Sequence, residues 1–213
     1  MSVNFGSKDG ILIRTMTVED YKQIDGNVFK DEPLKSSLDK EPKEIEEARK
    51  KRFDDYHIRL IENGTCLAAI NENDNGRVVG VVLAYGQVPS DMKNYHKSAI
   101  SNFLSEAEVK ANLFARYEVS NVLISHITNV DASMRGKGIG SRLAVALMEL
   151  GRSQGYPLMA AFCTSFYSAR QNEALGMECV YSQAYADYKD ENGKVVFNPP
   201  APHTHLRIMA IKL

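Results

Sequence analysis

The sequence predicts a single α/β domain in which helices flank a mixed, twisted β-sheet. Strand-like and helix-like segments alternate along the chain. A hairpin in the middle and strands at the end favour a sheet that is only partly parallel. The 213 residues contain no linker and no internal repeat. A hydrophobic content of 44% and a charged content of 25% are typical of a globular protein with a buried core.

The N-terminal half predicts a strand, two helices and a hairpin. Residues 11–29 begin with an apolar run and continue with a helical pattern, and Thr17 with Asp20 resembles a capping box in which Asp replaces the usual Glu. Residues 42–64 predict a helix that starts with a proline and ends just before a glycine. Residues 65–86 predict a hairpin, because two β-rich runs flank an Asn-Gly turn signal.

The C-terminal half predicts helices that alternate with strands, followed by closing strands. The helical pattern changes to short apolar or alternating runs at glycine and proline positions. The predicted helices cover 98–117, 138–154 and 166–176, and the predicted strands cover 121–130, 157–163, 179–190, 194–199 and 203–213.

Composition excludes several classes of protein. A formal net charge of −1 argues against a general nucleic-acid binder, which needs a basic surface. No apolar run reaches the roughly 18 residues that span a bilayer, and the first ten residues carry no secretory signal. Cys66, Cys163 and Cys179 are too scattered for a disulfide framework or a zinc site. We therefore expect a cytoplasmic protein with reduced thiols and with no metal, membrane or nucleic-acid partner. We also expect a monomer, although composition does not determine the oligomeric state.

A glycine-rich turn lies between the strand 121–130 and the following helix, in the sequence "RGKGIG" from Arg135 to Gly140. A phosphate loop of the GxxxxGK[ST] type is excluded, since glycine follows Lys137. The dinucleotide pattern GxGxxG is excluded because Ser141 stands where a glycine is needed. Glycines let the backbone approach a ligand closely, and a helix N-terminus attracts anions. The turn therefore predicts a diphosphate site, with a tight turn that holds no ligand as the alternative.

The same segment resembles a known superfamily. "RGKGIGSRL", placed after "HITNV" and before "FCTSFYSARQNEALGM", resembles the acetyl-CoA site of the GNAT acyltransferases. "FKDEPL", "YSARQNEALGM", "YADYKDENGKVVF" and "APH" look like the insect arylalkylamine N-acetyltransferases, the group that contains dopamine N-acetyltransferase. The matches run from about residue 12 to the C-terminus. The resemblance implies one GNAT domain over residues 1–213.

The resemblance also implies an activity and a cofactor site. GNAT enzymes transfer acetyl from acetyl-CoA directly to an amine, here the primary amine of a small arylalkylamine such as dopamine, serotonin or tyramine. Non-aryl amines (polyamines, agmatine, histamine), a protein amine, or an acyl-CoA binder without turnover are the alternatives. The residues implied to bind acetyl-CoA are Asn129, Val130, Arg135, Gly136, Lys137, Gly138, Ile139, Gly140 and Ser141.

Acetyl transfer needs a base, because an alkyl amine with a pKa of about 10 is only about one-thousandth neutral at pH 7. The resemblance implies that Glu32, in "KDEPL", is this base and contacts the amine. Pro33 favours an extended backbone at Glu32. The alternative interpretation is a surface acid at the end of a helix.

The resemblance implies that Ser168 and Thr164 order the substrate and return a proton to the leaving thiolate, and that His203 lines the amine pocket. Helix capping is the alternative role of both hydroxyls. Asn172 occupies the place where many GNAT proteins carry a tyrosine, which excludes that general acid. The period of two places His203 and His205 on one face of a strand, with no third metal ligand evident.

Cys163 raises the alternative of a covalent acetyl-enzyme. It lies in an apolar segment, where the pKa of a thiol rises and its reactivity falls. We therefore expect Cys163 to be a core residue and the transfer to be direct.

Overall fold

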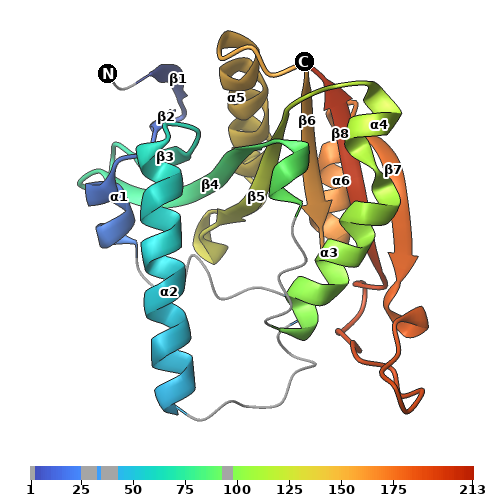
Figure 1. Cartoon of the computed structure of the whole chain (residues 1–213). Coiled ribbons are helices and arrows are strands. Elements are labelled where there is room, and N and C mark those ends of the chain that lie inside the picture. Colours follow the sequence, from blue (N-terminus) through green and yellow to red (C-terminus); the bar gives the residue numbers. More distant parts are fainter. Residues whose placement is uncertain (1–2, 25–32, 35–42, 93–97) are drawn as a thin grey trace. The chain divides into compact units, whose positions relative to one another are not determined.

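A computed structural model describes residues 3–24, 33–34, 43–92 and 98–213 (Figure 1). These residues divide into two compact units. The first unit contains the described residues of 3–24, 43–85 and 125–154, and the second contains those of 33–34, 86–92, 98–124 and 155–213. The single domain over 1–213 stays a prediction. None of the helices that the structure describes is both long and apolar enough to cross a membrane.

The first unit is a sheet covered by helices on both faces. Its strands follow the order β1-β2-β3-β4-β5, and the pairs β1–β2, β2–β3 and β3–β4 are antiparallel. The last residues of β4 and the first of β5 belong to the second unit. The strands are β1 (Asn4–Lys8), β2 (Ile11–Thr15), β3 (Leu67–Asn71), β4 (Arg77–Gln87) and β5 (Val122–Val130), and the helices are α1 (Val18–Gln23), α2 (Lys43–Glu62) and α5 (Ile139–Ser153).

The caps and turns of this unit form where the sequence predicts them. Thr17 and Asp20 form the capping box of α1. Asn75 and Gly76 adopt φ values of 47° and 71° at the β3–β4 turn, which is the left-handed geometry that the Asn-Gly signal predicts. α5 begins after Gly138 and ends at Ser153, within one residue of the prediction.

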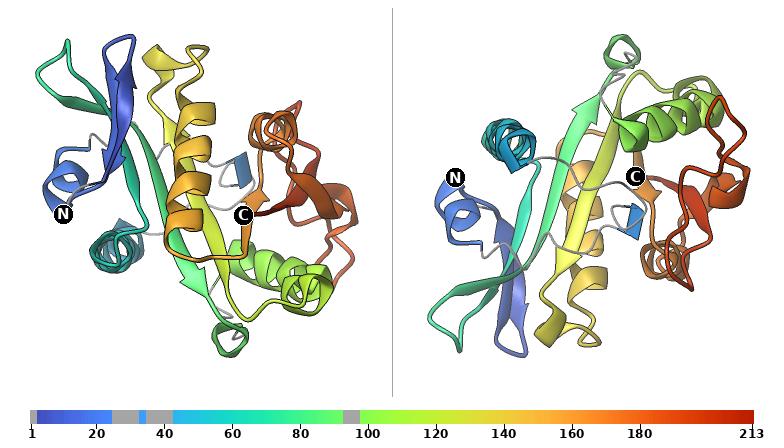
Figure 2. Two further views of the ribbon diagram at one scale, coloured as in Figure 1. Left: turned by 90° about the horizontal axis from the view of Figure 1, so that it is seen from above. Right: turned by 90° about the horizontal axis from the view of Figure 1, so that it is seen from below.

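Alternating side chains of the sheet contact different helices. On one face, Leu12, Ala68 and Leu83 pack in a cluster with Leu60 and Ile61 of α2. On the other face, α5 approaches β4 at Gly80, where an added Cβ would lie 3.1 Å from a methyl group of Leu143. Figure 2 shows α2 and α5 on opposite sides of these strands. The period-two alternation thus gives the unit two cores, one on each face.

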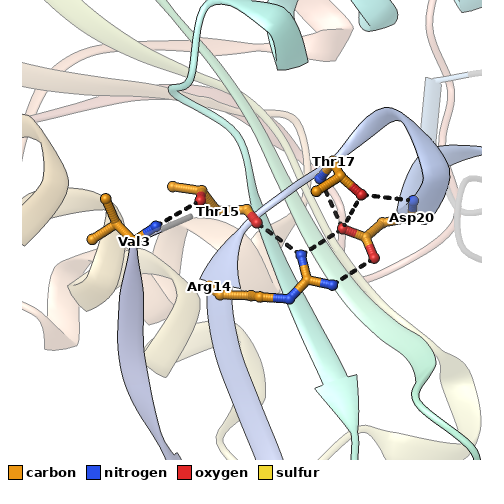
Figure 3. Close-up of polar contacts among 5 residues, drawn as sticks. All are labelled: Val3, Arg14, Thr15, Thr17 and Asp20. Atoms are coloured by element: carbon orange, nitrogen blue, oxygen red, sulfur yellow. Dashed lines mark hydrogen bonds and ion pairs between the residues drawn. The ribbon is translucent and has the colours of Figure 1, made fainter. Parts of the chain in front are cut away.

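An ion pair connects β2 to α1 (Figure 3). The Arg14 guanidinium donates to both oxygens of the Asp20 carboxylate, at 2.6 and 2.8 Å, and Asp20 also accepts hydrogen bonds from the backbone and hydroxyl of Thr17. Burial alone would raise the pKa of the Asp20 carboxyl, but the hydrogen bonds from Arg14 and Thr17 outweigh burial and lower that pKa. Asp20 is therefore ionised at neutral pH, and its charge stabilises the fold.

Replacing Asp20 by Asn is expected to destabilise the protein by about 1–3 kcal/mol at pH 7, because a half-buried arginine and a helix cap lose a charged acceptor. The folded-state pKa is below the unfolded value of about 3.9, so this contribution is present above pH 4 and is lost as the pH falls further. Urea denaturation of the wild type and the Asp20→Asn variant at several pH values measures this contribution to the free energy of unfolding. A stability difference between wild type and variant that does not narrow below pH 4 contradicts this assignment.

The second unit is an antiparallel sheet with the strand order β6-β8-β7. α3 contacts β7 and β8, and α6 contacts β8 and β6. Figure 2 shows α3 and α6 on opposite sides of these strands. The strands are β6 (Leu158–Cys163), β7 (Glu178–Ala184) and β8 (His205–Lys212), and the helices are α3 (Ala99–Ala111), α4 (Leu113–Tyr117) and α6 (Phe166–Ala174).

The structure differs from the sequence prediction at several elements. The predicted helix 98–117 is two helices, because Asn112 adopts φ 47° and ends α3. The predicted strand 194–199 is a loop with one isolated bridge, between Lys189 and Val195, and its Phe197 packs instead against Phe103 of α3. The N-terminal strand β1 was not predicted, because it is largely exposed and carries no alternating apolar pattern.

Candidate functional site

The glycine turn follows β5 directly and opens α5. A short 3₁₀ turn over Ala132–Met134 separates Val130 from Arg135, and residues 135–138 are exposed. Gly136 and Gly138 have φ values of 76° and 72°, which side chains rarely tolerate, whereas Gly140 lies inside the helix. Two of the three glycines are therefore required by the backbone itself.

The turn also has open space in front of it. A Cβ added to Gly136 or Gly138 would meet no protein atom within 4 Å. Gly138 is the N-cap of the 15-residue helix α5 and offers no side chain to its first-turn N–H groups. These donors, the helix dipole and the exposed side chains of Arg135 and Lys137 suit a diphosphate. The residues present thus fit the phosphate end of a coenzyme A molecule.

A salt-bridged brace, formed by Arg77 and Asp131, holds the entrance to this turn. The Asp131 carboxylate accepts hydrogen bonds from the Ser133 backbone (2.8 Å) and hydroxyl (2.7 Å) and from the Arg77 guanidinium (2.7 Å). Hydrogen bonds from Ser133 and then from Arg77 lower the pKa of Asp131. The Asp131 backbone N–H donates to the Val79 carbonyl of β4. No local sequence pattern indicates this brace, since Arg77 lies 54 residues from its partner.

Replacing Arg77 by Ala is expected to weaken acetyl-CoA binding several-fold, because the 3₁₀ turn before Gly136 loses its side-chain connection to β4 and keeps only the backbone hydrogen bond from Asp131 to Val79. Isothermal titration calorimetry of acetyl-CoA measures the effect. Asp74→Asn is the matched control: Asp74 accepts a hydrogen bond from the Arg77 Nε at 2.6 Å but does not contact the turn, so its loss should leave the affinity unchanged. Equal effects of both variants contradict a specific role of the brace.

The second unit brings Thr164, Ser168 and His203 together at the start of α6. Ser165 is the N-cap: its hydroxyl accepts a hydrogen bond from the Ser168 N–H at 3.0 Å, and the Ser168 hydroxyl donates to the Ser165 carbonyl at 2.9 Å. The Thr164 carbonyl accepts a hydrogen bond from the Tyr185 hydroxyl at 2.6 Å. Capping, the alternative role of Thr164 and Ser168, is thus performed by Ser165.

His203 does not lie on a strand with His205, as the period of two had predicted, because β8 begins only at His205. The Nδ1 atom of His203 accepts a hydrogen bond from the Phe166 N–H at 3.1 Å, and its ring packs edge-on against Tyr167. An Nδ1 atom that accepts carries no proton, so the ring proton of the neutral imidazole lies on Nε2. His203 therefore presents a donor at the N-terminus of α6.

Cys163 is a core residue, as expected. Its side chain is buried and its sulfur accepts a hydrogen bond from the Asn172 amide at 3.2 Å. Burial raises the pKa of the Cys163 thiol, which disfavours the nucleophilic thiolate. Cys66 is also a buried free thiol, and Cys179 is an exposed one.

Glu32 lies outside the described residues. The next two residues of its motif are described, and Leu34 is fully buried. Over the part of the chain that the structure describes, no group of three histidine, cysteine or acidic side chains could hold a metal ion.

Comparison with known proteins identifies the fold. An agmatine N-acetyltransferase matches with a TM-score of 0.80 at 26% identity, over 96% of this chain and all of that one. The polyamine N-acetyltransferase of Drosophila melanogaster, described as catalysing the formation of N-acetylagmatine, matches with a TM-score of 0.78 at 27% identity, over 95% of this chain and all of that one. Arylalkylamine N-acetyltransferase 2 of Aedes aegypti matches with a TM-score of 0.81 at 24% identity, over 96% and 99% of the two chains. No family model matches the chain.

These similarities confirm the predicted α/β fold, which is the fold of N-acetyltransferases of the GNAT superfamily. Within this class, its structural neighbours are insect arylalkylamine N-acetyltransferases and N-acetyltransferases of polyamines and agmatine.

Proposed function

We propose that this enzyme transfers acetyl from acetyl-CoA directly to the primary amine of a small molecule. The observation that carries the proposal is the open glycine turn at the N-terminus of α5, immediately after β5. The similarity to N-acetyltransferases at 26–27% identity supports it. We also propose that residues 1–213 form one domain and that the protein is a cytoplasmic monomer.

The acetyl-CoA site is proposed to follow the chain from the end of β5 into α5. The diphosphate accepts hydrogen bonds from the first-turn N–H groups of α5, and Arg135 and Lys137 contribute positive charge. The backbone of Asn129 and Val130 binds the pantetheine arm and polarises the thioester carbonyl. The complete proposed set is Asn129, Val130, Arg135, Gly136, Lys137, Gly138, Ile139, Gly140 and Ser141.

Glu32 is proposed as the base that accepts a proton from the ammonium group of the substrate and orients the amine. Without such a base, the scarcity of the neutral amine at pH 7 corresponds to about 4 kcal/mol. The motif "KDEPL" supports this assignment. Ser168 and Thr164 are proposed to order the substrate and to return a proton to the thiolate, with His203 contributing its Nε2–H to the amine pocket.

Direct transfer predicts that Cys163→Ala keeps at least about a third of the wild-type kcat, since the thiol serves only packing. The loss of a buried partner for Asn172 is expected to lower stability by about 1–3 kcal/mol. Steady-state kinetics and thermal denaturation separate the two effects. A folded Cys163→Ala protein that binds acetyl-CoA but has lost nearly all activity requires a covalent mechanism instead.

Two classes of acceptor are supported by different observations. The motifs "KDEPL" and "APH" favour an arylalkylamine such as dopamine, serotonin or tyramine. The neighbours at 26–27% identity favour agmatine or a polyamine. A thiol-release assay with acetyl-CoA and a panel of dopamine, serotonin, tyramine, octopamine, histamine, agmatine and spermidine tests both. Turnover with none of them, while acetyl-CoA still binds, would overturn the small-amine proposal and favour a protein amine or a binder without turnover.

A further inference from the structure

In the second unit, one buried tyrosine joins the connection between β7 and β8 to the start of α6. Tyr185 follows β7 directly, and only 2% of its surface is exposed. Its hydroxyl donates a hydrogen bond to the Thr164 carbonyl, directly after β6, over 2.6 Å. Its backbone N–H donates to the Thr204 carbonyl, directly before β8, over 3.0 Å. Tyr185 therefore holds the β6–α6 junction and the start of β8 at the same time.

A further hydrogen bond closes these contacts into a ring. The Phe166 N–H, two residues after Thr164, donates to His203 Nδ1 at 3.1 Å. His203 immediately precedes Thr204 in the chain, so the contacts lead back to the starting residue. We call this ring the Tyr185 bridge, and it consists of Thr164, Phe166, Tyr185, His203 and Thr204. The bridge thus includes two residues that are proposed to contact the substrate, Thr164 and His203.

Aromatic side chains hold the Tyr185 ring in place. The ring packs against Phe103 of α3 with a centroid distance of 5.8 Å, and edge-on against Phe197 with a centroid distance of 6.3 Å. Both phenylalanines are buried, and the Tyr188 ring stacks on Phe197. A ring that is packed on more than one side has a fixed orientation, so the direction of its hydroxyl is fixed as well. The aromatic packing therefore determines where the Thr164 carbonyl is bound.

Packing alone does not require the Tyr185 hydroxyl. A phenylalanine would fill the same space between Phe103 and Phe197 and would bring no polar atom into the core. A buried hydroxyl reduces stability unless it meets a hydrogen-bond partner in the right place. Here the partner belongs to the β6–α6 junction, 21 residues away in the chain. The hydroxyl therefore favours one placement of the start of α6 relative to the loop that carries His203.

We propose that Tyr185 is a positioning residue for the amine acceptor, because its hydroxyl sets the separation between the start of α6 and the His203 loop. The Ser168 hydroxyl donates to the Ser165 carbonyl at 2.9 Å, so Ser168 moves together with the start of the helix. An amine that contacts both Ser168 and His203 depends on their separation. Acetyl-CoA does not depend on it at the glycine turn, which contains no residue of the Tyr185 bridge. This inference rests on the proposed acetyltransferase function.

The test uses the full chain with the amines that the wild type acetylates. Tyr185→Phe is expected to raise the amine KM by about three- to tenfold, the effect of one lost hydrogen bond, with the acetyl-CoA Kd unchanged. The loss should be largest for the preferred amine, which uses the intact geometry most fully, so the ratio of kcat/KM between two amines should fall. In hydrogen–deuterium exchange, segments 164–169 and 200–205 should exchange faster than in the wild type.

Tyr188→Phe is the matched control. It removes a hydroxyl from the same aromatic cluster, but that hydroxyl contacts Glu106 of α3 at 3.4 Å and lies outside the Tyr185 bridge. The control should keep the wild-type KM values, the wild-type ratio between amines and the wild-type exchange of both segments. Equal effects of Tyr185→Phe and Tyr188→Phe overturn the proposal, because they indicate a general loosening of the aromatic cluster.

A folded Tyr185→Phe enzyme with the wild-type KM for every amine overturns the positioning role. An equal fall in kcat for all amines with every KM unchanged also overturns it, because it indicates only a smaller folded fraction. If Tyr185→Phe fails to fold, Phe197→Leu, which keeps the hydroxyl but loosens the packing of its ring, is measured in the same way with the same expected outcome. A wild type that acetylates no amine contradicts the proposed function and the positioning role with it, whereas the other outcomes leave that function intact, so the two failures are distinguishable.

Discussion

Replacing Glu32 by Gln is expected to lower kcat by about 10²-fold or more while acetyl-CoA binds with unchanged affinity. The amide keeps the size and hydrogen-bonding reach of the carboxylate but cannot accept a proton from the ammonium group. The remaining rate would come from the small neutral fraction of the amine, so the deficit should shrink as the pH rises toward about 10. Steady-state kinetics across pH, together with calorimetry of acetyl-CoA binding, measure both effects.

Asp31→Asn is the matched control, because it removes the same charge from the neighbouring position of "KDEPL". If Asp31→Asn lowers kcat as much as Glu32→Gln, the effect is a general loss of negative charge and not a base at Glu32. If Glu32→Gln retains the full rate, the base lies elsewhere. In an acyl-CoA binder without turnover, neither variant would have an activity to lose.

Replacing Gly138 by Val is expected to raise the acetyl-CoA Kd by at least about 10²-fold, corresponding to about 2.7 kcal/mol. Gly138 has φ 72°, where a non-glycine residue costs roughly 1–2 kcal/mol. The Cβ of the new side chain would meet no protein atom within 4 Å, and the side chain would extend into the space in front of the turn. The protein should therefore fold with reduced stability and lose the close approach of the diphosphate to the backbone.

Gly155→Val separates strain from lost binding. Gly155 follows the other end of α5, has φ 79° and is equally open, so its replacement carries the same backbone strain away from the glycine turn. Thermal denaturation should show similar destabilisation for both variants, whereas calorimetry should show lost binding only for Gly138→Val. Unchanged acetyl-CoA affinity in Gly138→Val would remove the glycine turn from the cofactor site.

Structural features that depend on only a few neighbouring residues could be predicted from the sequence. The capping box at Thr17, the Asn-Gly turn at Asn75 and the glycine turn at Gly138 each depend on local backbone geometry, and the structure confirms all three. The same local pattern misplaced His203, because the residues before β8 turn away from the strand, and the Phe166 N–H binds the His203 ring.

Contacts between distant residues were decided only by the tertiary structure. No local pattern distinguishes Arg77 as the partner of Asp131, or His57 of α2 as the neighbour of His126 of β5. Such pairs form because the strands and helices bury their apolar faces together, and that packing brings polar side chains next to one another. The sequence by itself determined the turns and the caps, including the backbone geometry of the glycine turn that precedes α5. The tertiary structure decided which distant side chains meet, such as Arg77 with Asp131 and His57 with His126.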